Sequence, residues 1–424
     1  MTTEEQRRES APRAAPESID IAIIGGGPAG LAAAESAALT LAGRRTPGPA
    51  LPGRIAVFEA MPSLGRKLLM AGKSGLNITF DAPSDRLIAA YRRSSPALEQ
   101  AVRAFGPAEI RAWMDGLGAP SFVGTSGRVF PEAMKASPLL RAWLRRLSGL
   151  GVETRPRWRW RRITAQGLDF ETPRGVRRVA ARVCVLAMGG ASWPRLGSTG
   201  AWTAELARLG APIAPFAPSN VGWSAGLSPF FLERFAGAPL KTIAAAAGGA
   251  RVRGALMITR YGFEGAPLYA LTPPLSAGAA LALDLAPDRR RDALIAALGK
   301  PRGKASFSSW MRKAARLGPA ETALLREAGA PPSEPEALAA RIKACPVPLT
   351  GPRPIEEAIS TAGGLAWEGV GPDLALRAHP TVFAAGEMLE WDAPTGGYLL
   401  TACLALGRRA GAAAAERLIE QDAG

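Results

Sequence analysis

Residues 21–30 read IAIIGGGPAG, and this stretch decides the fold. Four apolar residues lead into a glycine cluster, and an alanine-rich run from Leu31 to Leu39 follows it. This order predicts a buried strand, a tight turn and then a helix. We expect Gly25 to adopt the dihedral angles of the turn, Gly27 to let a pyrophosphate approach the backbone, and Gly30 to let the helix pack closely on the strand.

The helix predicted to begin at Pro28 and Ala29 would direct free N–H groups and the positive end of its dipole toward a ligand. A glycine triplet alone is weak evidence, because ordinary turns use the same residue. Here the glycines lie between a strand and a helix near the N-terminus, which is the context that a dinucleotide-binding fingerprint requires. The stretch therefore predicts a dinucleotide site.

The second strand is predicted at residues 54–59, RIAVFE, and it ends in Glu59. A carboxylate at this place accepts hydrogen bonds from ribose hydroxyls and disfavours a 2′-phosphate, which predicts an adenosine with a free ribose. The spacing from Gly30 exceeds the usual length of about 20 residues, and we attribute the excess to an inserted loop at Ala42–Gly53. The alternative interpretation of Glu59 is a strand-end carboxylate without a partner.

Length and composition indicate a folded protein of two or three domains, since the chain has 424 residues, of which 47% are hydrophobic and 21% charged. Only residues 1–17, which are polar and charged, are predicted to be disordered. No apolar run is long enough to span a bilayer and no signal peptide is visible, so we expect a cytoplasmic protein. The 3 cysteines lie far apart, which argues against a disulfide framework and against a metal site.

The net charge is +16, from 52 lysines and arginines against 36 acidic residues. A field of this sign favours polyanionic partners, such as nucleic acid, an acidic membrane surface or a phosphorylated ligand. Genomic bias is an equal alternative, because arginine, alanine, glycine and proline are all heavily used. The sequence leaves both interpretations open.

Segment 65–80, GRKLLMAGKSGLNITF, follows the second strand and sustains neither a helical nor a strand period. We predict a loop whose donors, Lys67 and Lys73 among them, contact phosphates or a ring system. A solvated basic loop fits the composition equally well. Short helices are predicted within residues 96–118 and from Pro138 to Leu147.

A small antiparallel meander is predicted at about residues 151–180, with arginine and tryptophan alternating between Arg155 and Arg162. Such interleaving can grip single-stranded nucleic acid. A strand with tryptophan inside and arginine outside fits the same pattern, and we favour this second interpretation.

Two later strand ends repeat the logic of the first. Residues 183–194, VCVLAMGGASWP, predict a buried strand that ends in a glycine pair beginning at Gly189. Residues 381–387, TVFAAGE, predict a strand that ends in Gly386 and Glu387. An alanine-rich helix then opens at Gly396, Gly397 and Tyr398 and runs to about Ile419, which gives a second place to hold the middle of a dinucleotide.

Between about residues 215 and 348 the pattern of apolar and charged residues changes. Strand-like sequence comes first, at Gly254–Thr259 and Leu268–Leu271, and charged helical segments follow at residues 291–297, 306–316, 320–328 and 335–343. We therefore predict an α/β protein with a discontinuous Rossmann-like domain, formed by residues 18–214 and 349–424. A separate strand-plus-helix domain is inserted at 215–348.

Together these residues resemble the BaiN/YhiN-like flavoprotein family, also described as NAD(P)/FAD-dependent or aminoacetone-oxidase-like. The matching segments occur in the family's order at both ends of the chain: IIGGGPAGL, Glu59, GRKLLMAGKSGLNIT, GRVFPEAMKAS, LAMGGASWP, ISTAGG and FAAGEMLEWDAPTGGYLL. The inserted region matches only loosely, through GALMITRYGFEGAPLYAL.

The resemblance implies an FAD-binding fold. It implies that the ADP half of the cofactor is held by Gly25, Gly27, Gly30 and Glu59. Pro28 and Ala29, within the same fingerprint, are further candidate cofactor-binding residues. It also implies that Gly189, Gly386 and Glu387 lie near the middle of the cofactor, and that the isoalloxazine lies near Lys67, Gly72, Asn77, Gly396, Gly397 and Tyr398.

Two departures from the family's pattern matter for activity. Members typically carry an arginine and a cysteine in the loop that here spans Gly72–Asn77, and Leu76 stands at the cysteine position. A cysteine there could donate a proton during reduction of a double bond, whereas Leu76 cannot. Met188 stands where a threonine is common. We expect the flavin site to survive both changes, but a relative's substrate does not transfer directly.

Three functions fit this sequence, and we favour the first. It is an NAD(P)H-driven reductase of a carbon–carbon double bond, acting on uridine in ribosomal RNA or on a small molecule. NAD(P)H would dock transiently, because the chain has one dinucleotide fingerprint. Its catalytic residue is unassigned, with Lys67 and Lys73 as candidates that could stabilise the reduced flavin. The alternatives are a flavin amine oxidase of the aminoacetone-oxidase type and a non-catalytic, redox-sensing flavoprotein that binds RNA.

Overall fold

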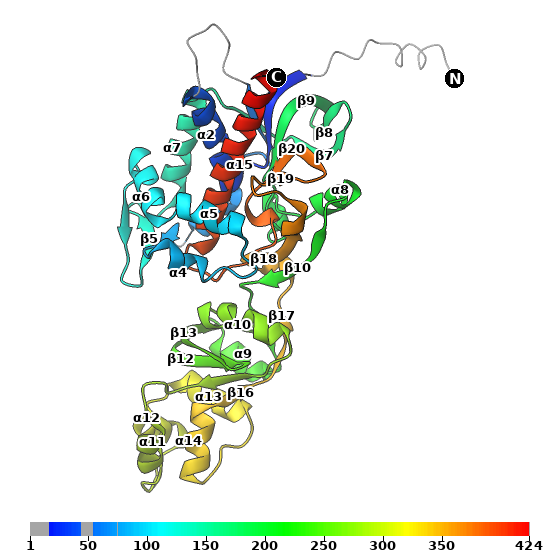
Figure 1. Cartoon of the computed structure of the whole chain (residues 1–424). Coiled ribbons are helices and arrows are strands. Elements are labelled where there is room, and N and C mark those ends of the chain that lie inside the picture. The colour runs from blue at the N-terminus through cyan, green and yellow to red at the C-terminus, as the bar shows by residue number, and fades with distance from the viewer. Residues whose placement is uncertain (1–16, 44–53, 74, 424) are drawn as a thin grey trace, which may run out of the picture.

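The computed structural model describes residues 17–43, 54–73 and 75–423 (Figure 1). The predicted disordered tail at 1–17 lies outside the described residues except for Glu17, where the prediction is wrong. Glu17 is the first residue of strand β1 and pairs with Val179 of strand β9. Most of the predicted inserted loop, residues 44–53, also lies outside the described residues.

A mostly parallel sheet forms the centre of the larger domain, with the strand order β19-β20-β9-β1-β2-β6 and with β19 antiparallel at its edge. The bounds are β1 Glu17–Ile24, β2 Ile55–Glu59, β6 Glu153–Pro156, β9 Gly175–Leu186, β19 Ala375–Leu376 and β20 His379–Ala384. The register aligns Ile24, Leu186 and Ala384 on neighbouring strands, so three carboxyl ends meet at one edge of the sheet. A crevice outside such an edge is where open α/β sheets bind ligands.

Helices α2 (Pro28–Gly43) and α15 (Tyr398–Ala423) cross beside this sheet (Figure 1). The crossing is a contact between backbones. A Cβ at Gly407 would lie 2.2 Å from the Ala29 carbonyl oxygen, and a Cβ at Gly411 would lie 2.1 Å from that of Ala33. The alanine and glycine content of both segments therefore lets the first helix and the last helix of the chain share one layer.

The predicted meander is confirmed for strands β7 (Arg159–Thr164), β8 (Gly167–Thr172) and β9, which pair antiparallel in order. Strand β6 differs from the prediction, because it pairs parallel with β2. Trp160 is buried, whereas Arg161 and Arg162 are exposed and pair with Glu171 and Asp169. The two-faced strand is the interpretation that the structure supports.

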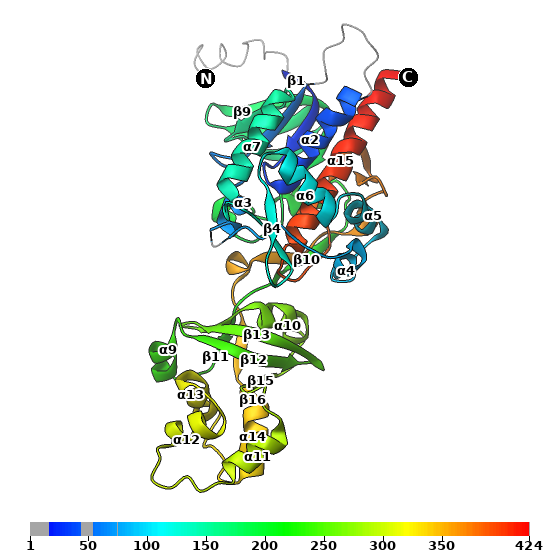
Figure 2. The same ribbon diagram turned by 90° about the vertical axis from the view of Figure 1, so that its left-hand side faces the viewer.

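Short helices and a three-stranded sheet cover the rest of this domain (Figure 2). Their bounds are α3 Arg66–Ala71, β3 Thr79–Phe80, α4 Ser84–Ile88, α5 Pro96–Ala104, α6 Pro107–Gly116, β4 Ser121–Val123, β5 Arg128–Pro131, α7 Ala136–Gly149, η1 Pro194–Leu196 and α8 Trp202–Arg208. The predicted helices within 96–118 and at 138–147 are confirmed. Segment 65–80 was expected to hold no helix, and α3 corrects this: Gly65, at φ 69°, starts a helix too short for a period to show.

Strands β10 (Ile213–Ser219) and β18 (Ser360–Leu365) form an antiparallel pair between the two domains. The inserted domain contains β11 Trp223–Ala225, α9 Pro229–Phe235, β12 Pro239–Ala247, β13 Ala250–Ile258, β14 Gly262–Glu264, α10 Ala266–Ser276, β15 Leu281–Asp284, α11 Arg291–Leu298, α12 Phe307–Ala314, α13 Pro319–Glu327, α14 Pro335–Lys343, β16 Cys345–Val347 and β17 Leu349–Pro352. Short 3-10 turns η2 Ile355–Glu357, η3 Trp367–Gly369 and η4 Gly386–Met388 belong to the return of the chain.

The inserted domain has its own sheet, β16-β15-β12-β13-β14-β11-β17, and its own hydrophobic core between Trp223 and Val347. The four predicted helices are confirmed as α11 to α14. The predicted strand at Leu268–Leu271 is wrong, because these residues lie in α10. A four-residue apolar run fits a buried helix as well as a strand, and here Pro267 in the first turn favours the helix.

Candidate functional site

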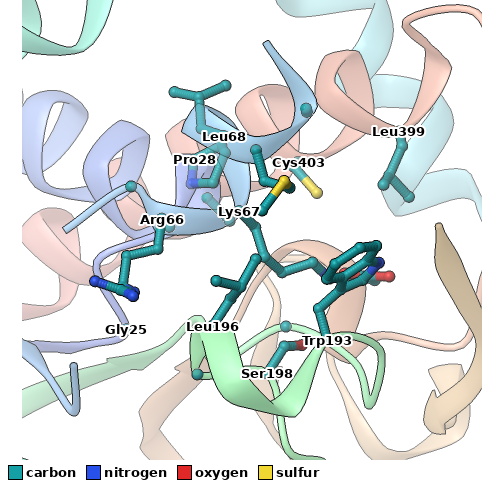
Figure 3. Close-up of a pocket in the computed structure, with 18 of the residues that line it drawn as sticks. Gly25, Pro28, Arg66, Lys67, Leu68, Trp193, Leu196, Ser198, Leu399 and Cys403 are labelled. Carbon is teal, nitrogen blue, oxygen red and sulfur yellow. The ribbon is translucent and has the colours of Figure 1, made fainter. Parts of the chain in front are cut away.

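A cavity with a volume of about 770 Å³ starts where the three parallel strands end. We call the part beside residues 25–29 and Glu59 the glycine-turn end. The part beside Asn220, Tyr269 and Ser360, where the inserted domain meets the first, is the domain-boundary end. Figure 3 shows Lys67, Trp193, Leu196 and Ser198 around the space between them.

The glycine turn has the geometry expected from its sequence. Gly25 adopts φ 109°, and a Cβ there would lie 2.3 Å from the Ala187 carbonyl oxygen. A Cβ at Gly30 would lie 1.9 Å from the Gly25 carbonyl oxygen, so this glycine lets strand and helix touch. A Cβ at Gly27 would meet no atom within 4 Å, so at this residue the backbone faces open space. The first turn of α2 leaves its N–H groups free for an anion.

Glu59 ends β2 beside this turn. Its two carboxylate oxygens accept hydrogen bonds from the backbone N–H of Gly26 and of Met61, both at 2.8 Å. The alternative of a strand-end carboxylate without a partner is therefore wrong. Burial raises the pKa of this carboxyl, and the two N–H groups with Arg159 and Arg66 oppose the rise. Each oxygen keeps a lone pair for a further donor, such as a ribose hydroxyl.

Lys67 and Glu387 join the two sides of the cavity at its middle. The Lys67 Nζ lies 3.1 Å from a Glu387 carboxylate oxygen and donates to the Ser192 hydroxyl at 3.0 Å. The other oxygen of Glu387 accepts the Thr361 N–H at 3.1 Å. Glu387 is 7% exposed, so the Lys67 ammonium is the partner that compensates for its burial.

Near the domain-boundary end the backbone approaches the cavity again. Gly397 adopts φ 95°, and a Cβ there would lie 2.6 Å from the Thr79 backbone of strand β3. Gly396 and Asn77 line the cavity next to this contact. The glycine pair therefore brings the start of α15 against the segment that carries Asn77.

The structure brings most of the sequence-predicted site residues together. Those lining the cavity are Gly25, Gly27, Pro28, Ala29, Glu59, Lys67, Asn77, Gly189, Glu387, Gly396 and Gly397. Gly30, Gly72, Lys73, Gly386 and Tyr398 do not line it. Gly30 and Gly386 support the turn from behind, since a Cβ at Gly386 would lie 2.6 Å from that of Ala29. Lys73 is exposed, so of the two lysines only Lys67 reaches the cavity.

Several side chains of the cavity have buried polar atoms without a hydrogen-bond partner, and sequence reasoning did not identify all of them as ligand-binding residues. Among the described residues, seven buried polar side-chain atoms have no hydrogen-bond partner, and four of them belong to residues that line this cavity. These four are Arg66 Nε, Asn77 Oδ1, Trp160 Nε1 and Asn220 Oδ1. Arg66 and Asn77 lie in segment 65–80, which the sequence predicts to contact the ligand. Trp160 stood in a segment flagged for another reason, and no motif marks Asn220, which adopts φ 50° after β10.

These observations fit an FAD. Volumes of about 300–1,000 Å³ are usual for cofactor pockets, and the cavity has the open backbone at Gly27 that a pyrophosphate needs. Its unpaired donors and acceptors would gain partners from a polar ligand. The residues described contain no cluster of three or more metal-ligating side chains, and no helix among them is long and apolar enough to cross a membrane.

Comparison with known proteins places the chain among Rossmann-domain proteins that include a reductase. The model of the HI0933-like protein Rossmann domain matches residues 19–413. The chain is 27% identical over 424 residues to the 3-dehydro-bile acid delta(4,6)-reductase of Clostridium scindens, covering 94% of this chain and 99% of that protein.

Among solved structures, the chain is similar to the 3-ketosteroid delta1-dehydrogenase of Sterolibacterium denitrificans in complex with 1,4-androstadiene-3,17-dione. The TM-score is 0.51 at 12% identity, covering 95% of this chain and 100% of that one. This likeness concerns the fold.

Proposed function

Since the chain belongs to the HI0933-like family, and is therefore an FAD-dependent oxidoreductase related to reductases of carbon–carbon double bonds, we propose that it reduces a double bond conjugated to a carbonyl group. Bound FAD supplies the hydride once a reductant, for which we propose NAD(P)H, has reduced it. The substrate would lie at the domain-boundary end.

The observation that carries this proposal is that, among the described residues, no carboxylate lines the domain-boundary end of the cavity. Among the described lining residues the carboxylates are Glu59 and Glu387. Glu59 accepts two backbone N–H groups, and Glu387 is paired with Lys67. A cationic amine would find no anionic partner, whereas a neutral enone matches the surface formed by Asn220, Tyr269 and Ser360. This favours double-bond reduction over amine oxidation.

The proposal is tested with the FAD-loaded protein. We expect NADH or NADPH to be consumed in the presence of 2-cyclohexenone or 4-androstene-3,17-dione under argon, with a saturated ketone as product. Aminoacetone in air should release no hydrogen peroxide. Peroxide release from aminoacetone together with no consumption of enone would overturn the proposal and establish the oxidase.

Uridine within RNA is a second candidate substrate, favoured by the charge at the far end of the inserted domain. We call this region, residues 289–316, the basic tip. It holds nine basic residues and one acidic residue, so it carries +8 of the net +16 of the chain. The basic residues are Arg289, Arg290, Arg291, Lys300, Arg302, Lys304, Arg312, Lys313 and Arg316. Figures 1 and 2 place its helices, α11 and α12, away from the central sheet.

The basic tip differs from the arginine-rich meander, whose Arg161, Arg162 and Arg178 face acidic partners. In the described residues of the tip, Arg290 with Asp292 is the one ion pair. The tip also exposes none of the large hydrophobic side chains that would anchor a membrane surface. An RNA backbone, bound through its phosphates, is therefore the partner we propose for the tip.

A labelled RNA hairpin tests this partner. We expect its Kd to rise roughly 40-fold between 50 and 200 mM KCl, as for about three neutralised phosphates. The variant R302E/R312E/K313E should lose this salt dependence. The matched control R174E/R177E changes two exposed arginines at the β8–β9 hairpin and should retain it. Equal losses in both variants would contradict a specific role for the tip.

A further inference from the structure

We propose that Tyr269, which belongs to the inserted domain, donates the proton that completes the reduction. The proposal rests on the proposed function, because it names the acid for that reaction. It also answers the question that Leu76 raises. Leu76 is fully buried and does not line the cavity, so the position that carries cysteine in relatives supplies no acid here.

Tyr269 is placed at the domain-boundary end by helix α10. It lines the cavity together with Ala266, three residues earlier on the same helix face. Side chains of a helix lean toward its N-terminus. The hydroxyl of Tyr269 accordingly faces the backbone N–H of Gly265, which precedes the first turn of α10.

The hydroxyl of Tyr269 is free to act. In the described part of the chain, no carboxylate, carbonyl or hydroxyl accepts a hydrogen bond from it, although the residue is half-buried. Two other tyrosines are committed: the Tyr91 hydroxyl donates to the Tyr398 carbonyl at 2.9 Å, and the Tyr261 hydroxyl donates to Glu264.

The other ionisable groups that line the cavity are poorly suited to this step. Glu59 lies at the glycine-turn end and accepts two backbone N–H groups, and Glu387 is paired with Lys67. Lys67 is held by Glu387 and Ser192. Arginine side chains keep their protons at any working pH. Cys403 lies near the glycine turn, with its Sγ 3.7 Å from where a Cβ of Gly386 would be, and burial raises the pKa of its thiol to about 12.

The charges around Tyr269 suit an acid that keeps its proton until the substrate takes it. Burial raises the pKa of its phenol to about 12, Glu264 adds to the rise, and the Gly265 N–H opposes it. Two further charged groups lie nearby: Arg353 stacks on Tyr261, and Arg92 donates to the carbonyl of Ala270. The phenol stays protonated at neutral pH, and the phenolate left after donation faces the N-terminal end of α10.

The step balances as follows. Bound reduced FAD would supply a hydride, with its two electrons, to the β-carbon of the enone and would itself be oxidised. The O–H bond of Tyr269 breaks and a C–H bond forms at the α-carbon, so the carbon–carbon double bond becomes single. Solvent would return a proton to the phenolate, and NAD(P)H would reduce the flavin again.

The first test is a single turnover under argon, with reduced holoenzyme mixed with 2-cyclohexenone. Tyr269→Phe should reoxidise its flavin 100- to 10,000-fold more slowly, as expected for a lost general acid, while NAD(P)H still reduces it at the wild-type rate. Tyr261→Phe, whose ring does not line the cavity, is the matched control and should stay within roughly threefold of the wild type.

The outcomes separate the two claims. A wild-type protein that is not reoxidised by enones would overturn the proposed function. A wild-type protein that is reoxidised, with Tyr269→Phe reacting equally fast, would overturn only the role of Tyr269.

The second test does not depend on turnover. The chain has 4 tyrosines, so ultraviolet titration at the phenolate band can be compared between the wild type and Tyr269→Phe. The difference should show a phenol that ionises only in strong alkali. Because the Glu264 charge raises this pKa, Glu264→Gln should move the ionisation to lower pH. A difference curve that shows ordinary ionisation, unmoved in Glu264→Gln, would contradict the assigned surroundings of Tyr269.

Discussion

The two ends of the cavity are built in opposite ways. At the glycine-turn end, consecutive residues supply backbone N–H groups, and the lone carboxylate, Glu59, is satisfied by the backbone of Gly26 and Met61. At the domain-boundary end, side chains from distant parts of the chain meet, with the buried Asn220 and the half-buried Tyr269 each keeping an unpartnered polar atom or hydroxyl. The residues of the glycine-turn end are therefore close together in the sequence, whereas those of the domain-boundary end are brought together only by folding.

This contrast matches a division of labour. A cofactor with a fixed chemical structure can be held by backbone geometry, which tolerates little change in sequence. A substrate site is formed by side chains, and here they come from the residue after β10, from α10 and from β18. The following predictions test whether the two ends can be altered separately.

The largest effects are expected at the glycine turn. Gly25→Ala should destabilise the protein by about 3 kcal/mol, because the new Cβ would overlap the Ala187 carbonyl at a left-handed residue. Gly27→Ala is the matched variant, since its Cβ meets no protein atom. We expect an unchanged Tm of the FAD-free protein but a Kd for FAD roughly tenfold higher. Thermal unfolding measures the Tm and flavin fluorescence measures the Kd. A lowered Tm for Gly27→Ala would contradict the open space beside the Gly27 backbone.

An intermediate effect is expected from the lysines. Lys67→Met leaves the buried Glu387 without its cation, and the free energy of unfolding should fall by about 1–3 kcal/mol, reduced because Lys67 is 26% exposed on its side chain. The flavin reduction potential should also become more negative. Lys73→Met is the control and should change neither quantity. Equal potentials in all three proteins, measured against a redox dye, would exclude Lys67 as a stabiliser of the reduced flavin.

The smallest effect is expected at position 76. Adding Leu76→Cys to Tyr269→Phe restores the residue type that relatives carry, but this side chain is fully buried and does not line the cavity. Single-turnover rates of the double variant and of Tyr269→Phe should therefore agree within about twofold. A recovery of tenfold or more would show that a thiol at this position reaches the substrate.

The sequence predicted the glycine-turn end because every part of it is local. A glycine acts through its own backbone. The roles of Gly25, Gly27 and Gly30 can therefore be predicted from the strand and the helix that flank them. Glu59 follows from the same logic at the end of the next strand. Helices α5 and α6 were also predictable, since each begins with a proline, and α7 was predictable from its apolar stripe.

The domain-boundary end could not be predicted for the opposite reason. Asn220 and Tyr269 line the same cavity only because β10 pairs with β18 and α10 packs on the sheet of the insert, and no spacing in the sequence encodes that. The strand expected at Leu268–Leu271 shows the difficulty: a short apolar run does not reveal its period, and assigning it to a strand hid the helix that presents Tyr269. A role beside the flavin was predicted for Lys73 from composition alone, and in the structure its side chain is exposed.

The most direct test of the account is the stoichiometry of one anaerobic turnover. Holoenzyme with a known amount of reduced FAD is mixed with excess 2-cyclohexenone, and oxidised flavin and cyclohexanone are quantified together. We predict one cyclohexanone for each flavin reoxidised, with no oxygen present. Flavin that stays reduced under enone but is reoxidised by oxygen after reduction by aminoacetone would contradict the account.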